Sequence, residues 1–382
     1  SNNTSNNQES AKNNNNGVQS NKENVKLNLN DIIEELLNQY FHVVSFMRIM
    51  EIYNENFIVY YQQMEDEYHN ISRIISNENS SKVSSGKSDG KSSDNAPGRD
   101  SGSGVLPSNF MVKLFCLDPQ QQLQEVLKKG KAAVFFSATL TPLTYHREIL
   151  GGNEDDYILD LESPFDSNNL CLMIAPTIST KYSNRKKSYS VIADLVAATI
   201  SSKKGNYLVF FPSYAYMTAV YDYFVTNHPD FDTIIQSRDM TERERGTFLR
   251  KFSANKAITG FAVLGGIFSE GVDLKGDRLL GSIVVGVAHP RICLERNLIR
   301  DYFQKKNGAG YEFAYLYPGI NKVLQAAGRT IRTETDRGLI LLIGERFTTA
   351  RYQVMLPGWW NEIKIIVPTV SEIKNQLEQF WI

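Results

Sequence analysis

The chain has 382 residues, of which 42% are hydrophobic, and its formal net charge is −1. This length suits one large domain with additions or two domains, and the near-neutral charge excludes a global basic field, so any nucleic-acid contact has to come from local patches. No apolar run reaches the ~18 residues that a membrane-spanning helix needs, and the Asn- and Ser-rich start lacks the apolar core of a signal peptide, which predicts a cytoplasmic protein without a membrane partner.

Residues 1–25 consist almost entirely of Asn, Ser, Gln and Lys. Such a stretch cannot bury enough apolar surface to offset the entropy of ordering it, so we expect it to be disordered. A helix is predicted next, because Asp31 and Glu34 form a capping-box pattern and apolar residues recur at helical spacing from Ile33 to Met47.

Two strands are predicted around a long flexible loop. The runs Phe57–Tyr61 and Phe110–Cys116 are rich in β-branched and aromatic residues. Residues 77–107 between them are rich in Ser, Gly, Lys and Asp, which is typical of a flexible connection. We interpret residues 26–117 as a partial accessory segment made of one helix and one hairpin.

Near residue 118 the pattern changes, and short apolar runs begin to alternate with amphipathic helices. Buried strands spaced by helices are typical of a parallel α/β sheet, which we expect over residues 118–382. The predicted strands are Ala132–Phe136, Leu170–Ile174, Tyr207–Phe211, Thr233–Ile235, Phe261–Leu264, Ile283–Val287 and Leu339–Ile343. The predicted helices include Val191–Ile200, Ala215–Phe224 and Thr241–Phe252, the last opening with a capping box of Thr241 and Glu244.

The cysteines and histidines give no metal pattern. Cys116, Cys171 and Cys293 are far apart and each stands in apolar surroundings, which predicts buried thiols in a reducing compartment and not disulfides. No C-x-x-C or H-x-x-x-H spacing is present, so we predict no metal or iron–sulfur site in this chain.

Hydroxyl side chains follow two of the predicted strands, where ligands collect in parallel sheets. Ser137 and Thr139 come after the first run, and Thr141 with Pro142 can begin the next helix as its cap and first residue. Ser213 and Tyr214 follow a later strand at another helix start, where backbone N–H groups can hold a phosphate. A plain helix cap is the more probable interpretation of Ser213 on its own.

A glycine-rich loop follows a third strand and carries Glu270 and Asp273. Its glycines permit close approach of the backbone to a ligand. Carboxylates beside phosphates need a sugar hydroxyl, a metal or a cation as partner, and we favour a hydroxyl or an arginine. A solvated acidic loop is the alternative.

The stretch Gln325-Ala-Ala-Gly-Arg-Thr-Ile-Arg332 precedes the last predicted strand. On a helix starting near Asn321, residues Gln325, Arg329 and Arg332 would share one face. Two neighbouring guanidiniums make most sense if an anion meets them, and arginine suits phosphate because its planar fork donates in pairs. A surface helix with two solvated arginines is equally compatible with these eight residues.

Taken together, Ser137-Ala-Thr-Leu140, Phe211-Pro-Ser-Tyr214, Ser269–Leu274 and Gln325–Arg332 resemble motifs III, IV, V and VI of superfamily 2 helicases, in that order. The detail is similar to the XPD/DinG branch in its bacterial DinG-like form, and the resemblance covers roughly residues 108–360. One departure is Gly344, which stands where that family more often has Asp.

The resemblance implies a RecA-like second motor domain, preceded by a helix and hairpin derived from the family's arch insertion. It implies catalytic arginine fingers at Arg329 and Arg332 with Gln325 beside them. The nucleotide contacts that it implies are Glu270, Gly271, Asp273 and Gly328. The DNA contacts that we expect are Ser137, Thr139, Ser213, Tyr214 and Arg238.

The phosphate-holding half of such a motor is not recognisable in this sequence. The nearest approaches to a Walker A loop, at Gly86-Lys-Ser88 and Gly90-Lys-Ser92, lack the first glycine, and the DEAH-like Asp66–His69 is not preceded by a continuous apolar strand. We therefore expect a monomeric chain that shares ATP and Mg²⁺ with an N-terminal motor domain, acts on single-stranded or forked DNA, and is inactive alone. The alternatives are a non-catalytic RecA-like module that binds nucleic acid or a partner, and a related ATPase that acts on RNA or protein–DNA complexes.

Overall fold

The computed structural model describes residues 29–63, 110–269, 273–360 and 362–382. The chain divides into two compact units, Ser1–Asn54 and Glu55–Ile382. The segment 1–25, the loop 77–107 and the DEAH-like motif at Asp66–His69, on all of which predictions were made, lie outside the described residues.

The described part of the first unit is the helix α1 (Leu29–Glu51), which confirms the helix predicted from apolar spacing. Its apolar residues are largely exposed, Leu36 at 64% and Phe41 at 60%. The side chain of Asp31, the predicted cap, lies outside the described part.

The second unit begins with an antiparallel hairpin of β1 (Phe57–Gln63) and β2 (Phe110–Cys116). The register places Phe57 opposite Cys116 and Tyr60 opposite Lys113. Both predicted strands are therefore confirmed.

A parallel sheet of seven strands forms the centre of the second unit, as predicted, in the order β5-β6-β4-β7-β8-β3-β9. The strands are β3 (Leu170–Ala175), β4 (Tyr207–Phe211), β5 (Asp232–Ile235), β6 (Ile258–Val263), β7 (Gly281–Val285), β8 (Gly338–Ile343) and β9 (Ile363–Ile365). The edge strand β9 was not predicted, because three residues are too short for a pattern to show.

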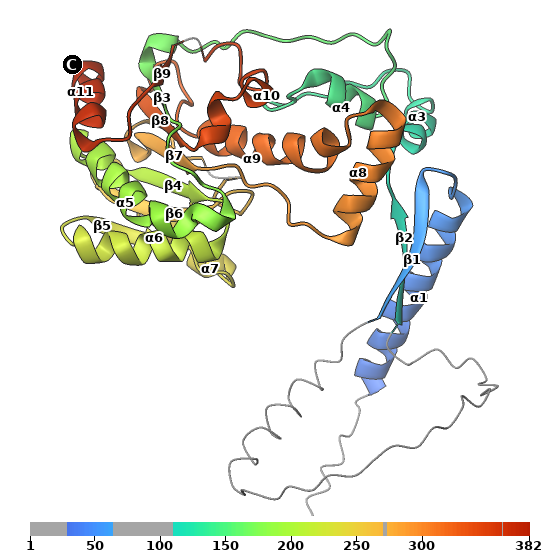
Figure 1. Ribbon diagram of the computed structural model, residues 1–382. Helices are drawn as coiled ribbons and strands as arrows, with labels where there is room; N and C mark the ends of the chain where they lie inside the picture. The colour runs from blue at the N-terminus through green and yellow to red at the C-terminus, as the bar shows by residue number, and fades with distance from the viewer. Residues whose placement is uncertain (1–28, 64–109, 270–272, 361) are drawn as a thin grey trace, which may run out of the picture. The chain divides into compact units, whose positions relative to one another are not determined.

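Helices cover both faces of this sheet (Figure 1). One core packs one set of alternate strand residues against α5 (Arg185–Ser202), α6 (Tyr214–Asn227) and α11 (Val370–Trp381). The other core packs the remaining strand residues against α7 (Glu242–Arg250), α9 (Tyr317–Ala327) and α10 (Ala350–Gln353). Because a strand between two helical layers is buried on both sides, its sequence is apolar without alternation.

A further helix, α8 (Leu294–Asn307), follows β7 and ends at Gly308, whose φ of 74° suits glycine at a helix end. A π-helical turn at Glu312–Leu316 then leads directly into α9. The predicted helix start near Asn321 is therefore four residues late, because α9 begins at Tyr317 with Pro318 in its first turn.

The predicted strand Ala132–Phe136 is wrong for this structure. The segment has no strand pairing and lies exposed between α3 (Gln120–Leu127) and α4 (Leu143–Ile149), with Val134 at 82% and Phe136 at 89% exposure. A strand needs a neighbour for its backbone hydrogen bonds, and the described residues offer it none.

Two smaller predictions also fail. Pro142 is the cap residue of α4 and not its first residue, and the structure shows no side-chain cap bond there, so Thr141 does not cap the helix. Of the cysteines, only Cys171 is buried, while Cys116 is half-buried and Cys293 is exposed, although all three are free thiols as predicted.

Candidate functional site

The two arginines of the Gln325–Arg332 stretch lie beyond the end of α9. The helix ends at Ala327, and the Gly328 N–H donates to the Leu324 carbonyl as its cap. Arg329 and Arg332 therefore do not share a helix face with Gln325, and that prediction is wrong. The reason lies in Thr330, which is 2% exposed and donates to Ser282 Oγ of β7, so the chain turns into the sheet after the cap.

The position of the arginines in the sheet follows from these contacts. Ser282 is the second residue of β7, and the arginine segment directly precedes β8. Both arginines thus lie toward the amino ends of the strands. Of the loops that follow the carboxyl ends, where chemistry was expected to collect, those after β4 and β5 form a different group of residues.

The arginine segment is held by Asp336, which the sequence reasoning did not single out. One carboxylate oxygen of Asp336 accepts from the backbone N–H groups of Arg332 at 2.7 Å and Thr333 at 2.9 Å, and the residue is only 7% exposed. A buried carboxylate with two backbone donors fixes the loop that carries Arg332. The Thr-x-x-Asp spacing, which favours local side-chain-to-backbone bonds, was the available signal.

The glycine-rich loop meets the arginines on this side. Arg329 Nε donates to the Ser269 carbonyl at 3.2 Å, and Arg332 Nε lies 4.0 Å from Asp273 Oδ1. Asp273 also pairs with Lys275 Nζ at 3.3 Å, and its side chain is 58% exposed. Ion pairs this exposed contribute little to stability, so a phosphate can replace the carboxylate at low cost. Glu270 and Gly271 lie outside the described residues.

A second group of predicted residues lies at the carboxyl ends of β4 and β5. Ser213 caps α6 by accepting from the Tyr216 N–H at 3.4 Å, so the helix-cap interpretation holds. The guanidinium of Arg238 lies over the Tyr214 ring, 5.3 Å from its centroid, and Gln236 Nε2 donates to the Tyr214 hydroxyl at 2.9 Å. An aromatic ring and a cation therefore stand side by side.

Arg185 belongs to this group and was missed. Its guanidinium donates to Ser213 Oγ at 3.4 Å and lies over the Tyr216 ring at 4.8 Å. It opens α5 together with Lys186 and Lys187, and the first turn of that helix contains no acidic residue. Three cations at the positive end of a helix dipole are unfavourable without an anion, and this sequence feature could have revealed them.

Ser137 and Thr139 form a third group, on the exposed segment that follows the unpaired run. The Thr139 N–H lies 3.2 Å from Ser137 Oγ, and the two hydroxyl oxygens are 3.3 Å apart. The hydroxyls thus form a local turn of their own.

Gly344 follows β8 and adopts a φ of 143°, a conformation that residues with a side chain rarely adopt. A Cβ there would meet Thr180 Oγ1 at 3.2 Å. The aspartate more common in the resembled family would be strained in this backbone, which accounts for the glycine.

Over the described ranges, no group of three or more His, Cys, Asp or Glu side chains is arranged to hold a metal ion. Within the same ranges, no helix has both the length and the apolar character required to cross a membrane.

Comparison with known proteins identifies the class of this domain. Residues 196–363 match a family described as the helicase C-terminal domain. A solved structure titled XPD_Helicase superposes with a TM-score of 0.53 at 20% identity, covering 68% of this chain and 47% of that one, which supports the predicted RecA-like fold. The matched domain and the curated relatives described next support a C-terminal domain of the XPD/DinG family of superfamily 2 helicases.

Curated relatives agree with this family. The ATP-dependent DNA helicase XPD of Sulfolobus acidocaldarius is 26% identical over 257 residues, covering 63% of this chain and 44% of the relative. The ATP-dependent DNA helicase DinG of Photobacterium profundum is 27% identical over 259 residues, covering 64% of this chain and 36% of the relative. The chain therefore spans less than half the length of these relatives.

Proposed function

We propose that this chain supplies the second motor domain of an ATP-dependent DNA helicase that moves 5′ to 3′ on single-stranded DNA. The observation that carries the proposal is the arginine group, in which Arg329 and Arg332 stand outside α9 and Arg332 lies near the exposed Asp273. The family match and the names of the relatives support the same class of activity.

The arginines act as fingers in this proposal. Asp336 holds the backbone at Arg332, and the Ser269 carbonyl holds the guanidinium of Arg329, so the arginine segment is positioned before a ligand arrives. Preorganised cations stabilise the charge that develops on a transferring phosphoryl group. Asp273 pairs with the guanidinium of Arg332 until the γ-phosphate of ATP displaces the carboxylate.

The remaining phosphate and metal contacts belong to an N-terminal motor domain in this proposal. The guanidiniums fit the phosphates of ATP, but the described residues offer no cluster of carboxylates that fits Mg²⁺. The unpaired apolar run Ala132–Phe136 supports the existence of such a partner domain, because its exposed side chains and backbone are suited to joining another sheet. Gln325, Gly328, Glu270 and Gly271 remain candidates for further contacts at this boundary.

The DNA backbone is expected at the carboxyl-end group. Ser213, Tyr214 and Arg238 were predicted there, and Arg185 adds a further cation. In this proposal Ser137 and Thr139 couple the nucleotide state to DNA binding by this group. Because contacts with phosphates release counterions, affinity should fall steeply with salt.

The test replaces Arg329 or Arg332 by Ala in the full-length protein, with Arg243→Ala on the exposed side of α7 as the matched control. Each finger variant should lower kcat for DNA-stimulated ATP hydrolysis by about 10³-fold or more, while nucleotide affinity changes little. The control should hydrolyse ATP like the parent.

Unchanged turnover in both finger variants would remove the assignment. The chain of 382 residues, assayed alone, should show no ATPase activity above background. A full-length parent without ATPase activity would favour a non-catalytic binding module.

A further inference from the structure

One face of α8 carries three polar side chains that contact the hairpin or the residues directly beside its strands. Glu295, Tyr302 and Lys306 are spaced by seven and four residues, which places them along one side of the helix. The hairpin strands are far from α8 in the sequence, so tertiary contacts alone bring these groups together.

Glu295 ties both strands of the hairpin at once. One of its carboxylate oxygens accepts from the Tyr60 hydroxyl at 2.6 Å and from Lys113 Nζ at 3.0 Å. Tyr60 and Lys113 are direct partners in the β1/β2 register, one on each strand. The hydrogen bond from Tyr60, with that from Lys113, lowers the pKa of Glu295 to about 2, so the carboxylate is ionised near neutral pH.

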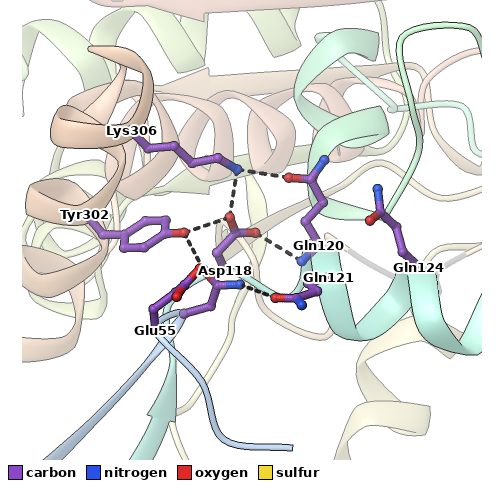
Figure 2. A pocket seen from close by; sticks show the side chains of 8 residues that line it. Glu55, Asp118, Gln120, Gln121, Gln124, Tyr302 and Lys306 are labelled. Carbon is purple, nitrogen blue, oxygen red and sulfur yellow. Dashed lines mark hydrogen bonds and ion pairs between the residues drawn. The ribbon is translucent and has the colours of Figure 1, made fainter.

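A second tie lies where the two strands meet the rest of the unit, and Figure 2 shows it. Asp118 follows β2 and is 2% exposed, and its carboxylate lies 2.7 Å from Lys306 Nζ and 3.1 Å from the Tyr302 hydroxyl. The same hydroxyl lies 2.7 Å from Oδ1 of Asn56, which precedes β1. Burial, with the neighbouring Asp118 carboxylate, raises the pKa of Tyr302 to about 12.

Lys306 extends this tie to a third element. Its Nζ lies 2.8 Å from Glu148 Oε1 of α4, in addition to Asp118 and Gln120. A polar hollow of about 340 Å³ opens beside these groups. The ammonium group of Lys306 on α8 thus contacts both α4 and Asp118, the buried residue just after β2.

We infer that Glu295, Tyr302 and Lys306 are positioning residues that clasp the hairpin to α8, so that the hairpin moves with the helicase domain as one body. α8 lies within the matched region 196–363. A buried ion pair stabilises less than an apolar contact of the same size, and its better-attested use is to fix one arrangement of two elements. The consequence for DNA unwinding rests on the function proposed above.

The first experiment measures hydrogen exchange of the backbone amides in β1 and β2, in the full-length protein. The variants are Lys306→Gln, Tyr302→Phe and Glu295→Gln, and the matched control is Lys305→Gln on the same helix. Each clasp variant should raise exchange in the hairpin about tenfold, because the hairpin then opens without the rest of the unit. The control should exchange like the parent.

A charge swap separates clasping from a general loss of structure. Glu295→Lys alone should release the hairpin, and Glu295→Lys combined with Lys113→Glu should restore parental exchange. The inference would be overturned if every single clasp variant exchanged like the parent. It would also be overturned if Glu295→Lys with Lys113→Glu failed to restore parental exchange and Tyr302→Phe left exchange unchanged.

The second experiment compares ATP hydrolysis with unwinding of forked DNA in the same proteins. Releasing the clasp should lower base pairs unwound per ATP by about tenfold while DNA-stimulated hydrolysis stays within about twofold. A released hairpin with parental unwinding per ATP would overturn the positioning role. A parent that hydrolyses no ATP contradicts the proposed function, and the exchange data alone then decide the clasp.

Discussion

Two runs of similar sequence adopt different structures in this chain, one as a buried strand and the other as an exposed unpaired segment. Ala132–Phe136 and Tyr207–Phe211 both end in Val-Phe-Phe after a small or apolar residue, and both lead into a hydroxyl-bearing turn. The second is the strand β4, whose residues are at most 1% exposed, while Phe136 of the first is 89% exposed.

The difference lies in the neighbours of each run. β4 has β6 and β7 as hydrogen-bonding partners and helices above and below it. The run at 132–136 has no strand beside it among the described residues. Strand propensity therefore makes a segment competent to pair, and only a pairing edge makes it a strand.

The largest expected effect tests this contrast directly. Phe210→Ala should lower the free energy of unfolding of the chain by about 3–5 kcal/mol, because it leaves a cavity in a packed core. Phe136→Ala should change it by no more than about 0.5 kcal/mol, as at other exposed positions. Urea unfolding followed by circular dichroism measures both.

If Phe136→Ala lowered the free energy of unfolding as much as Phe210→Ala, the run at 132–136 would be packed in solution. The contrast between this run and β4 would then be wrong. The full-length protein gives a sharper test of this contrast. If the run pairs with another sheet there, Phe136→Ala should lower the free energy of unfolding about as much as a core substitution does.

A smaller effect is expected at the hydroxyls that follow the two runs. Ser213→Ala should cost about 1 kcal/mol, because Ser213 caps α6. Ser137→Ala should leave stability unchanged, since its hydroxyl bonds only within a local exposed turn. Thr241→Ala, which removes the confirmed capping box of α7, serves as a positive control for the size of a cap. Equal losses at both serines in thermal melts would argue against this distinction.

The smallest expected effect is the pH dependence of hydrogen exchange in the hairpin. Ion pairs and hydrogen bonds hold the hairpin, whereas buried apolar side chains hold the sheet. The pKa of Glu295 is lowered to about 2, so the carboxylate contributes stability above its ordinary pKa near 4.5 and loses it as the pH falls toward 2. Hydrogen exchange, corrected for its intrinsic pH dependence, should therefore rise in β1 and β2 below pH 4.5 before it rises in β4. In Glu295→Gln this extra acid step should be absent, and its persistence there would assign it to another group.

Much of the fold was predictable because buried parallel strands and amphipathic helices leave strong local patterns. β4 and β2 were predicted to the residue, and the capping box at Thr241 was read directly from its spacing. β6 and β7 begin earlier than predicted, since Thr259, Gly260 and Gly281 lie in the sheet without the apolar side chains that mark a strand.

The site was predictable in its residue types and less so in its geometry. An arginine was one of the two partners favoured for the acidic loop, and Arg332 lies near Asp273, but Arg329 and Arg332 were placed on a helix that ends before them. Helical spacing cannot foresee that Thr330 buries its hydroxyl against Ser282, a residue 48 positions away. Asp336 and Arg185 were missed as site residues although each left a local signal, the Thr-x-x-Asp spacing for Asp336 and the cations at the start of α5 for Arg185; the contact of Arg185 with Ser213 depends on the tertiary fold.

The sequence by itself determined the class of fold and the chemistry available, because side-chain polarity and spacing decide which segments can be buried and which groups can meet a phosphate. The tertiary structure alone decided where α9 stops, which apolar run becomes a strand, and that one face of α8 holds the hairpin. Those outcomes depend on hydrogen-bond partners distant in the chain, and a partner of that kind leaves no trace in the local pattern.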